Sequence, residues 1–180
     1  SLASKVKSNL NIKNPNCVAY DLIFGCPGWL EGLIQAYNFI KAGAADKCLV
    51  IGAETLSRVV DKVDRDSMIF SDGAGAVIVE KSDSENGVVA YKSVTYTDNN
   101  EIDILNFERS YDSKDENKYI KMKGRKVYEF ALKKVPEAMK ECIEKANVNI
   151  DDIKKIFIHQ ANMKMDDAIV KRLYSLYNKE

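Results

Sequence analysis

The sequence predicts an α/β fold with a substantially parallel sheet, and three observations support this class. Short apolar runs typical of buried strands occur at residues 17–24, 47–53 and 154–158. Amphipathic patterns with a helical spacing of three and four separate these runs. Glycine stands at the breaks, with Gly25 after the first run and Gly43 where a helix should end. Such alternation is typical of sheets whose parallel strands are joined by crossover helices.

The first predicted half comprises residues 1–85. Its first strand-like run gives way at Pro27 to a helix, because apolar residues then recur on one face. That face consists of Trp29, Leu30, Leu33, Ile34, Tyr37 and Ile40. After the next strand, a charged loop leads to the small-residue stretch 70–76 and directly to a strand at 77–80. We expect this half to end where the composition turns polar.

The second predicted half comprises residues 86–180. A strand is predicted at 88–97, and the hydrophilic stretch 98–118 that follows is expected to be an exposed excursion. Gly124 then precedes a long amphipathic helix that is predicted to run to about Ala146. The last helix has its apolar residues at Ala168, Ile169, Leu173 and Leu176.

The composition is that of an ordinary globular protein. The 180 residues suit one domain with a real core, and 46% of them are hydrophobic while 30% are charged. Twenty-seven basic residues balance twenty-seven acidic ones, so no overall field favours nucleic acid or a membrane surface. No apolar run reaches the roughly 18 residues that cross a bilayer. Residues 1–10 lack the apolar core of a signal peptide.

The four cysteines predict a reducing, cytoplasmic location and no metal. No two of them form a C-x-x-C pair and only one histidine is present, so a zinc site is not expected. Cys17, Cys48 and Cys142 lie within apolar stretches that we interpret as core, which disfavours disulfides. Cys26 differs, because it stands at a break between predicted elements.

Cys26 is the candidate nucleophile. It directly precedes Pro27, and proline favours the first helical position, so Cys26 is predicted to be the helix N-cap. There its sulfur would lie near unpaired amide groups and the positive end of the helix dipole, which favours the thiolate. Gly25 and Gly28 would let the chain turn sharply and a substrate approach closely. The alternative is a small core residue in a strand-to-helix turn.

His159 is the only histidine, so any imidazole chemistry must use it. It ends the predicted strand 154–158, and Gln160 and Asn162 add two further polar side chains there. Ligands bind outside the C-terminal ends of parallel strands, where Cys26 is also predicted to lie. The alternative is a polar cluster whose hydrogen bonds are satisfied within the fold.

The stretch 72–76, Asp-Gly-Ala-Gly-Ala, does not predict a phosphate-binding loop. It lacks the lysine of a P-loop and precedes a strand, whereas a nucleotide loop precedes a helix. We expect its small residues to allow close backbone packing beneath a site. The charged residues of 98–126 are interpreted as solvated surface.

Taken together, several segments resemble β-ketoacyl-acyl carrier protein synthase III, a family of thiolase-fold condensing enzymes. In the family's order they are Cys26-Pro27-Gly28, Asp64-Arg65, Phe70 to Ala76 and Ile158 to Asn162, with Met122-Lys123-Gly124 as a fifth. The resemblance covers essentially the whole chain. It implies a thiolase-like fold of mixed, mostly parallel sheets with helices, in two pseudo-repeated halves that are here truncated at both ends.

The resemblance also implies an acyltransferase that starts type II fatty acid synthesis. Cys26 would take an acyl group from an acyl-coenzyme A (acyl-CoA) primer. His159 would assist decarboxylation of malonyl-acyl carrier protein, and the resulting enolate would attack the acyl-cysteine to give a 3-oxoacyl product. Acyl-CoA and malonyl-acyl carrier protein are then substrates, and no cofactor is expected.

The same resemblance implies two groups of binding residues. The substrate contacts, from the adenine end of CoA along the pantetheine channel, would be Arg65, Gly124, Ala161 and Asn162. The surface for the acidic carrier protein would be Gln160, Lys164, Lys171 and Arg172. The family also implies a homodimer.

The sequence departs from complete family members in two ways. It lacks flanking segments at both ends, among them the asparagine of a Cys–His–Asn set, so we expect this chain alone to be an impaired enzyme. Pro27 also stands where many relatives have alanine. Two alternatives stay open: a polyketide or alkylquinolone-type condensing enzyme, and a non-catalytic scaffold that keeps the fold.

Overall fold

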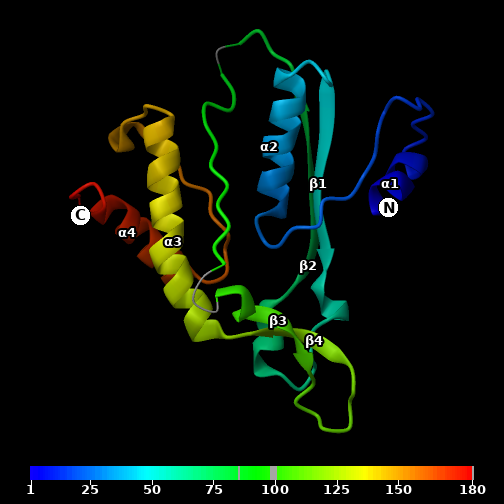
Figure 1. Cartoon of the computed structure of the whole chain (residues 1–180), viewed down its shortest axis with the longest axis vertical. Helices are drawn as coiled ribbons and strands as arrows, with labels where there is room; N and C mark the ends of the chain where they lie inside the picture. Colours follow the sequence, from blue (N-terminus) through cyan, green and yellow to red (C-terminus); the bar gives the residue numbers. More distant parts are fainter. Residues whose placement is uncertain (85, 98–100, 180) are drawn as a thin grey trace.

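The computed structural model describes residues 1–84, 86–97 and 101–179. Its helices are α1 (Leu2–Asn9), α2 (Gly28–Lys41), α3 (Gly124–Lys145) and α4 (Met163–Ser175). Its strands are β1 (Lys47–Thr55), β2 (Asp72–Glu80), β3 (Leu105–Arg109) and β4 (Lys118–Met122). Short 3₁₀ turns are η1 (Leu56–Arg58), η2 (Arg65–Ile69), η3 (Glu101–Asp103) and η4 (Ile150–Asp152). In Figure 1, α2 lies along the β1–β2 ribbon, α3 and α4 lie to one side, and the β3–β4 hairpin crosses the lower end.

The β1–β2 ribbon is antiparallel and pairs from Lys47 with Glu80 to Thr55 with Asp72. Both strands were predicted, and both are longer than the apolar runs alone suggest. Parallel neighbours need a crossover connection, usually a helix, and only η1 and η2 lie between these strands. β3 and β4 are antiparallel as well. Among the described residues, the expected parallel pairing is limited to one isolated bridge, between Val60 and Ile120.

Three predicted strands, at 17–24, 88–97 and 154–158, have no strand assignment in the structure. An apolar run becomes a strand only where its backbone pairs with another strand, and periodicity does not reveal whether that partner exists. These predictions were therefore wrong for the described chain. The division into halves at residue 85 stays a prediction, because residue 85 lies outside the described residues, as does residue 180.

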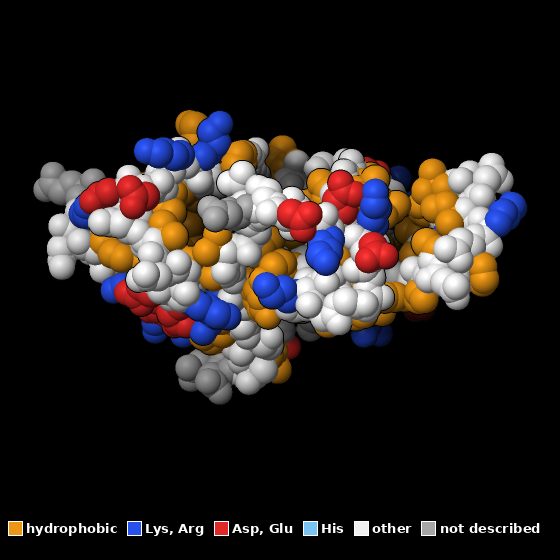
Figure 2. All heavy atoms as spheres, turned by 90° about the horizontal axis from the view of Figure 1, so that it is seen from above, with side chains coloured by type: hydrophobic (Ala, Val, Ile, Leu, Met, Phe, Trp, Pro, Cys, Tyr) orange, Lys and Arg blue, Asp and Glu red, His pale blue; other side chains and the backbone are white. Residues whose placement is uncertain are grey.

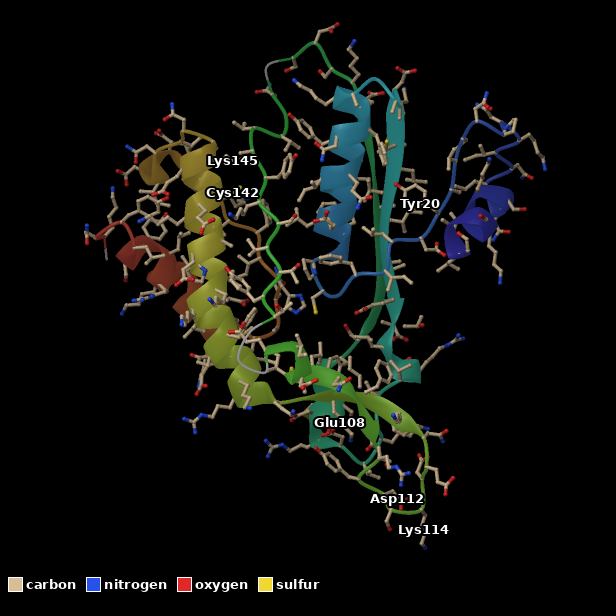
Figure 3. The ribbon with its side chains drawn as sticks, viewed as in Figure 1. Tyr20, Glu108, Asp112, Lys114, Cys142 and Lys145 are labelled. Carbon is tan, nitrogen blue, oxygen red and sulfur yellow. The ribbon has the colours of Figure 1, made fainter. Side chains whose placement is uncertain are left out.

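The described part of the stretch 98–118 is largely exposed, as expected, but it also contains a strand that the sequence did not predict. Residues 98–100 lie outside the described part, but β3 follows them and pairs with β4, with Phe107 opposite Ile120. The apolar positions of β3 are separated by polar ones and flanked by charged residues, which hides the strand in the composition. All five residues of β3 are exposed, as is most of the hairpin tip, and Figure 3 places Glu108, Asp112 and Lys114 towards that end.

The N-terminal helix α1 is held by a side chain from outside the helix. The Asp21 carboxylate accepts hydrogen bonds from the backbone amides of Leu2 and Ala3, both at 2.7 Å. The hydrogen bonds from the backbone amides of Ala3 and Leu2 lower the pKa of Asp21. Because α1 has no buried residue, this contact rather than apolar packing attaches its start.

One of two small cores lies between α2 and β1. Ile34 and Ala36 of α2 and Val50 of β1 are buried. The helix ends as predicted, with Gly43 just beyond it at a φ of +71°, a conformation that favours glycine. This core therefore comes from the apolar helix face and the strand that the sequence identifies.

Gly52 lets the start of α2 approach the ribbon closely. A β-carbon at Gly52 would lie 3.0 Å from Trp29 Cβ and 3.2 Å from Trp29 Cδ1. A β-carbon at Gly32 would likewise lie 3.1 Å from Val50 Cγ1. Since Trp29 is in the first turn of α2, the packing at Gly52 also sets the position of the turn that contains Cys26.

Gly52→Val is therefore expected to lower the free energy of unfolding by about 1–3 kcal/mol, the usual cost of overpacking. The valine side chain would clash with Trp29, and the higher strand propensity of valine does not offset this clash. Chemical denaturation measures the loss. The matched control is Gly73→Val on β2, because nothing lies within 4 Å of a β-carbon there. Equal stability of the two variants would show that the close approach at Gly52 carries no energetic weight.

The second core lies between α3 and α4. Leu173 is fully buried, Ile169 and Met165 line the same face of α4, and Pro136 of α3 is also buried. The Lys140 ammonium donates to the Leu176 carbonyl at 3.2 Å and joins the two helices further. The predicted apolar stripe of the last helix is confirmed.

Residues 88–97 connect the two cores instead of forming a strand. Towards α2, the Tyr91 hydroxyl donates to Asn38 at 3.1 Å and Ser93 donates to Glu31 at 2.6 Å. Towards α3, Lys145, labelled in Figure 3, donates to the Tyr91 carbonyl at 3.1 Å. The segment accordingly runs between α2 and α3 in Figure 1. Side-chain contacts on both sides replace strand pairing.

Large apolar side chains are common on the surface. Ile23, Met68 and Phe157 are 98%, 80% and 86% exposed. Figure 2 shows apolar side chains between basic and acidic ones across one face. In the part of the chain that the structure describes, no helix has the length and apolar character needed to span a membrane. Apart from Ile150 of η4, the buried apolar side chains of the described chain belong to the two cores.

Candidate functional site

Cys26 lies in a tight turn immediately before α2. The turn closes with a hydrogen bond from the Gly28 amide to the Gly25 carbonyl at 2.8 Å. Cys26 is exposed, and Pro27, with φ −81° and ψ 12°, is the N-cap. The prediction that Cys26 itself is the N-cap was wrong by one residue. Proline precedes the helix here instead of opening it, so Cys26 stands one position further out.

The other cysteines do not all lie in the core. All four cysteines are free, Cys17 is exposed, and Cys48 and Cys142 are half-buried. Burial raises the pKa of the Cys48 thiol, which disfavours its thiolate. The placement of Cys17 in the core was wrong, because the run at 17–24 is not a buried strand. Exposure therefore distinguishes Cys26 from two cysteines but not from Cys17.

His159 lies in the segment between η4 and α4 and is exposed. Gln160 and Ala161 beside it are exposed too. Asn162 is the N-cap of α4, and its side-chain oxygen accepts from the Met165 amide at 2.9 Å. In the described part of the chain, no hydrogen bond joins Cys26 and His159, so their pairing stays a prediction.

Arg65 is the first residue of η2 and is exposed. The N-cap of this turn is Asp64, whose Oδ1 accepts from the Asp66 amide at 2.9 Å. The other oxygen, Oδ2, accepts from the Lys121 ammonium at 2.9 Å. The Arg65 turn is therefore attached to β4 by Lys121, a residue that the sequence did not single out.

Lys121 is the centre of a buried ionic cluster. Only 5% of its side chain is exposed, and it donates to Asp61 at 2.5 Å as well as to Asp64. Its ammonium also lies 3.6 Å from the centroid of the Tyr111 ring. Asp61, 4% exposed, accepts further bonds from the backbone amides of Tyr111 at 2.9 Å and Val63 at 3.1 Å.

Both the lysine and Asp61 of the cluster are held in their charged forms. Burial opposes the charge on Lys121, but the hydrogen bonds to Asp61 and Asp64 outweigh it, so the pKa of Lys121 is raised. Burial likewise opposes the charge on Asp61, and the bonds from Lys121, Tyr111 and Val63 lower the pKa of Asp61 well below its usual range. No sequence signal reveals this cluster, because Lys121 lies 57 residues from Asp64 and 60 residues from Asp61 in the chain.

Gly124 begins α3, three residues after Lys121. A β-carbon at Gly124 would be 3.9 Å from Met122 Cε, an ordinary contact, so local packing does not require glycine there. Gly73 and Gly75 have nothing within 4 Å of a β-carbon. The expectation that these two small residues allow close backbone packing is therefore wrong for the described chain.

The predicted carrier-protein residues lie on or just before α4. Lys164, Lys171 and Arg172 are exposed. Lys171 and Arg172 also line an open groove of about 540 Å³ between α3 and α4, together with Lys133. The structure thus brings three basic residues to one groove, although only two of them were singled out from the sequence.

The described residues hold no group of three or more His, Cys, Asp or Glu side chains that could bind a metal ion. Asp72, the first residue of β2, has its carboxylate hydrogen-bonded within the fold. It accepts from the Ser57 amide at 2.8 Å and from the Ser57 hydroxyl at 2.6 Å. The chemically notable exposed groups are therefore Cys26, His159, Arg65 and the basic residues of α4.

Comparison with known proteins gives a consistent result. A family model described as 3-oxoacyl-[acyl-carrier-protein (ACP)] synthase III matches residues 20–99. β-Ketoacyl-[acyl-carrier-protein] synthase III of Prochlorococcus marinus is 37% identical over 94% of this chain and 52% of its own length. The Aquifex aeolicus protein of the same name is 34% identical over 96% of this chain and 53% of its own length.

Solved structures show the same relationship. The synthase III of Thermus thermophilus superposes with a TM-score of 0.82 at 36% identity, covering 95% of this chain and 53% of that one. The priming β-ketosynthase of the R1128 polyketide biosynthetic pathway has a TM-score of 0.82 at 28% identity, covering 94% and 51%. The predicted thiolase-like fold is thereby confirmed. The chain spans about half the length of the curated relatives that it matches.

Proposed function

Because the chain belongs to the 3-oxoacyl-[acyl-carrier-protein] synthase III family of thiolase-fold condensing enzymes, we propose that Cys26 accepts the acyl group of an acyl-CoA primer. The observation that carries this proposal is the exposed Cys26 in the turn before α2. Its thiolate attacks the thioester carbonyl, the new C–S bond forms, and the CoA thiolate leaves and takes a proton.

His159 serves the second half of the proposed reaction. Decarboxylation of malonyl-acyl carrier protein breaks a C–C bond, releases CO₂ and leaves the electron pair on an enolate. A hydrogen bond from His159 stabilises the negative thioester oxygen, and such preorganised donors are often the largest contribution to catalysis. The enolate carbon then attacks the acyl-Cys26 carbonyl, which expels the Cys26 thiolate and gives the 3-oxoacyl product.

The substrate would lie along residues that the structure distributes over three elements. Arg65, at the start of η2, would contact the adenine end of CoA. Gly124, at the start of α3, would allow the pantetheine arm to approach, since packing leaves space there. Ala161 and Asn162 precede α4; because the Asn162 oxygen caps the helix, its amide nitrogen is the group proposed to face the pantetheine.

The acidic carrier protein would dock on α4 and the groove beside it. Exposed positive charge steers an acidic partner and mainly raises the association rate. Lys164, Lys171 and Arg172 are proposed to supply it, with Gln160 at the edge nearest His159. Lys133 extends this basic surface onto α3 through the shared groove.

The double variant Lys171→Glu/Arg172→Glu is expected to slow association with an acidic carrier protein by about 10- to 100-fold at low salt. The association rate is measured by stopped flow or surface plasmon resonance at two salt concentrations. Higher salt should reduce the difference between variant and wild type, because it screens the charges. The matched control is Lys154→Glu/Lys155→Glu, which reverses two exposed charges away from the groove. Similar slowing in both variants would place the docking surface elsewhere.

We further propose a cytoplasmic homodimer in which each chain contributes two pseudo-repeated halves. The four free cysteines support a reducing compartment. Exposed apolar side chains on the ribbon, Leu49 and Ile51 of β1 and Ile78 of β2, support an additional contact surface. Sedimentation at several protein concentrations tests the dimer.

A priming ketosynthase of a polyketide pathway is the second candidate, because such an enzyme superposes equally well on this chain. The same Cys26 chemistry serves both candidates. The carrier protein that accepts the condensation separates them: a fatty-acid carrier protein supports the first proposal, and exclusive use of a polyketide carrier protein supports the second.

Incubation with acetyl-CoA tests the proposal against a non-catalytic scaffold. We expect intact mass spectrometry to show one acetyl adduct, and peptide mapping to assign it to Cys26. The absence of an adduct after prolonged incubation with a folded chain would contradict the acyl-transfer proposal and favour the scaffold.

A further inference from the structure

The buried cluster around Lys121 holds the loop in which Arg65 lies. We propose that Lys121 is a positioning residue for the coenzyme A site, because it holds the Asp64 carboxylate that fixes the start of η2. The inference rests on the proposed function, in which Arg65 contacts the adenine end of CoA. It adds a residue that touches no substrate and acts through Asp64.

The two oxygens of Asp64 have separate tasks. Oδ1 accepts from the Asp66 amide at 2.9 Å and caps η2, while Oδ2 accepts from Lys121 at 2.9 Å. A carboxylate can rotate, and the ion pair with Lys121 holds it in the orientation that keeps the cap. Removing the ammonium therefore loosens the backbone at Asp64, the residue before Arg65.

The rest of the loop is held by the same hairpin. The Ile120 amide donates to the Val59 carbonyl at 2.9 Å, and Asp61 accepts from both Lys121 and the Tyr111 amide. These attachments lie on the N-terminal side of Asp64. The Lys121–Asp64 bond is the one in this set that reaches the residue next to Arg65.

Arg65 depends on this anchoring. It is exposed, and within residues 1–84, 86–97 and 101–179 its guanidinium makes no hydrogen bond or ion pair. A side chain with no hydrogen bond or ion pair to orient it is pre-placed chiefly through its backbone. Fixing one backbone residue costs conformational entropy, and an unanchored loop would lose that entropy on binding CoA.

Calorimetric binding of CoA and of pantetheine, which lacks the nucleotide, tests the inference. In Lys121→Met we expect CoA to bind about tenfold more weakly, a factor equivalent to about 1.4 kcal/mol. Pantetheine should bind within about twofold of the wild type. A role limited to general stability would weaken both ligands alike, so the ratio of the two affinities is the decisive readout.

Three variants sharpen the test. Asp64→Asn keeps an oxygen for the cap and the Lys121–Asp61 pair, so it decides the matter if Lys121→Met does not fold. Lys118→Met removes an exposed charge from the same strand and should change neither affinity. If Lys121 acts through Arg65, adding Lys121→Met to Arg65→Gln should cause no further loss of CoA affinity.

The inference is overturned if CoA and pantetheine weaken equally, if neither changes, or if the losses in the combined variant add. It is also overturned if the wild type binds CoA no better than pantetheine. That last result leaves the acyl-transfer proposal standing, because acetylation of Cys26 by acetyl-CoA is measured separately. Conversely, a chain that is not acetylated but shows the expected affinity ratio would contradict acyl transfer and support the role of Lys121.

Discussion

Cys26→Ala is expected to abolish the acetyl adduct that acetyl-CoA forms on this chain. Alanine has no nucleophile, and no nearby thiol shares the turn between Gly25 and Gly28. A lost adduct is thus an all-or-none effect instead of a reduced rate. Intact mass spectrometry at several times separates slow acylation from none.

Cys17→Ala is the control that this experiment needs. Cys17 is also exposed, so a thiol that reacts merely because it is accessible would be acetylated there as well. We expect Cys17→Ala to keep the full adduct and Cys26→Ala to lose it. An adduct that disappears in Cys17→Ala, or persists in Cys26→Ala, would show that the turn before α2 is not the acyl-accepting site.

His159→Ala is expected to slow decarboxylation of malonyl-acyl carrier protein by about 10²- to 10³-fold, the usual cost of one preorganised donor, or about 3–4 kcal/mol. Acetylation of Cys26 should continue, because the proposed role of His159 lies in the second half of the reaction. Release of CO₂ measures decarboxylation, and the acetyl adduct on Cys26 measures acylation. The two half-reactions would thereby be separated in one variant.

Two further variants define what His159 contributes. His159→Gln retains a hydrogen-bond donor and should lose less than His159→Ala. Lys155→Ala removes an exposed side chain from the same segment and should leave decarboxylation unchanged. If His159→Ala abolished the Cys26 adduct as strongly as decarboxylation, the histidine would act on the nucleophile itself, contrary to the division of roles proposed here.

Local patterns in the sequence were sufficient for much of this protein. The apolar spacing identified α2, α3 and α4, and Gly43 marked the end of α2. β1 and β2 followed from their apolar runs. The ordered motifs around Cys26 and His159 were enough to recognise the family, because they combine residue type, spacing and order along the whole chain.

Other features were decided only by the tertiary structure, because they depend on which segments meet. The apolar run at 88–97 lies between α2 and α3 and pairs with no strand of the described chain, so its periodicity was misleading. Similarly, Pro27 and not Cys26 caps α2, a distinction of one residue that backbone hydrogen bonds determine.

The buried cluster of Lys121, Asp61 and Asp64 is the clearest example. Nothing in the sequence links these three charged residues, and Lys121 was expected to lie on a solvated surface. The hairpin places Lys121 in contact with Asp64 and Asp61, which lie 57 and 60 residues earlier in the chain. A charge becomes a buried structural contact only when its partners are present to offset the cost of desolvation, and that pairing exists only after the chain has folded.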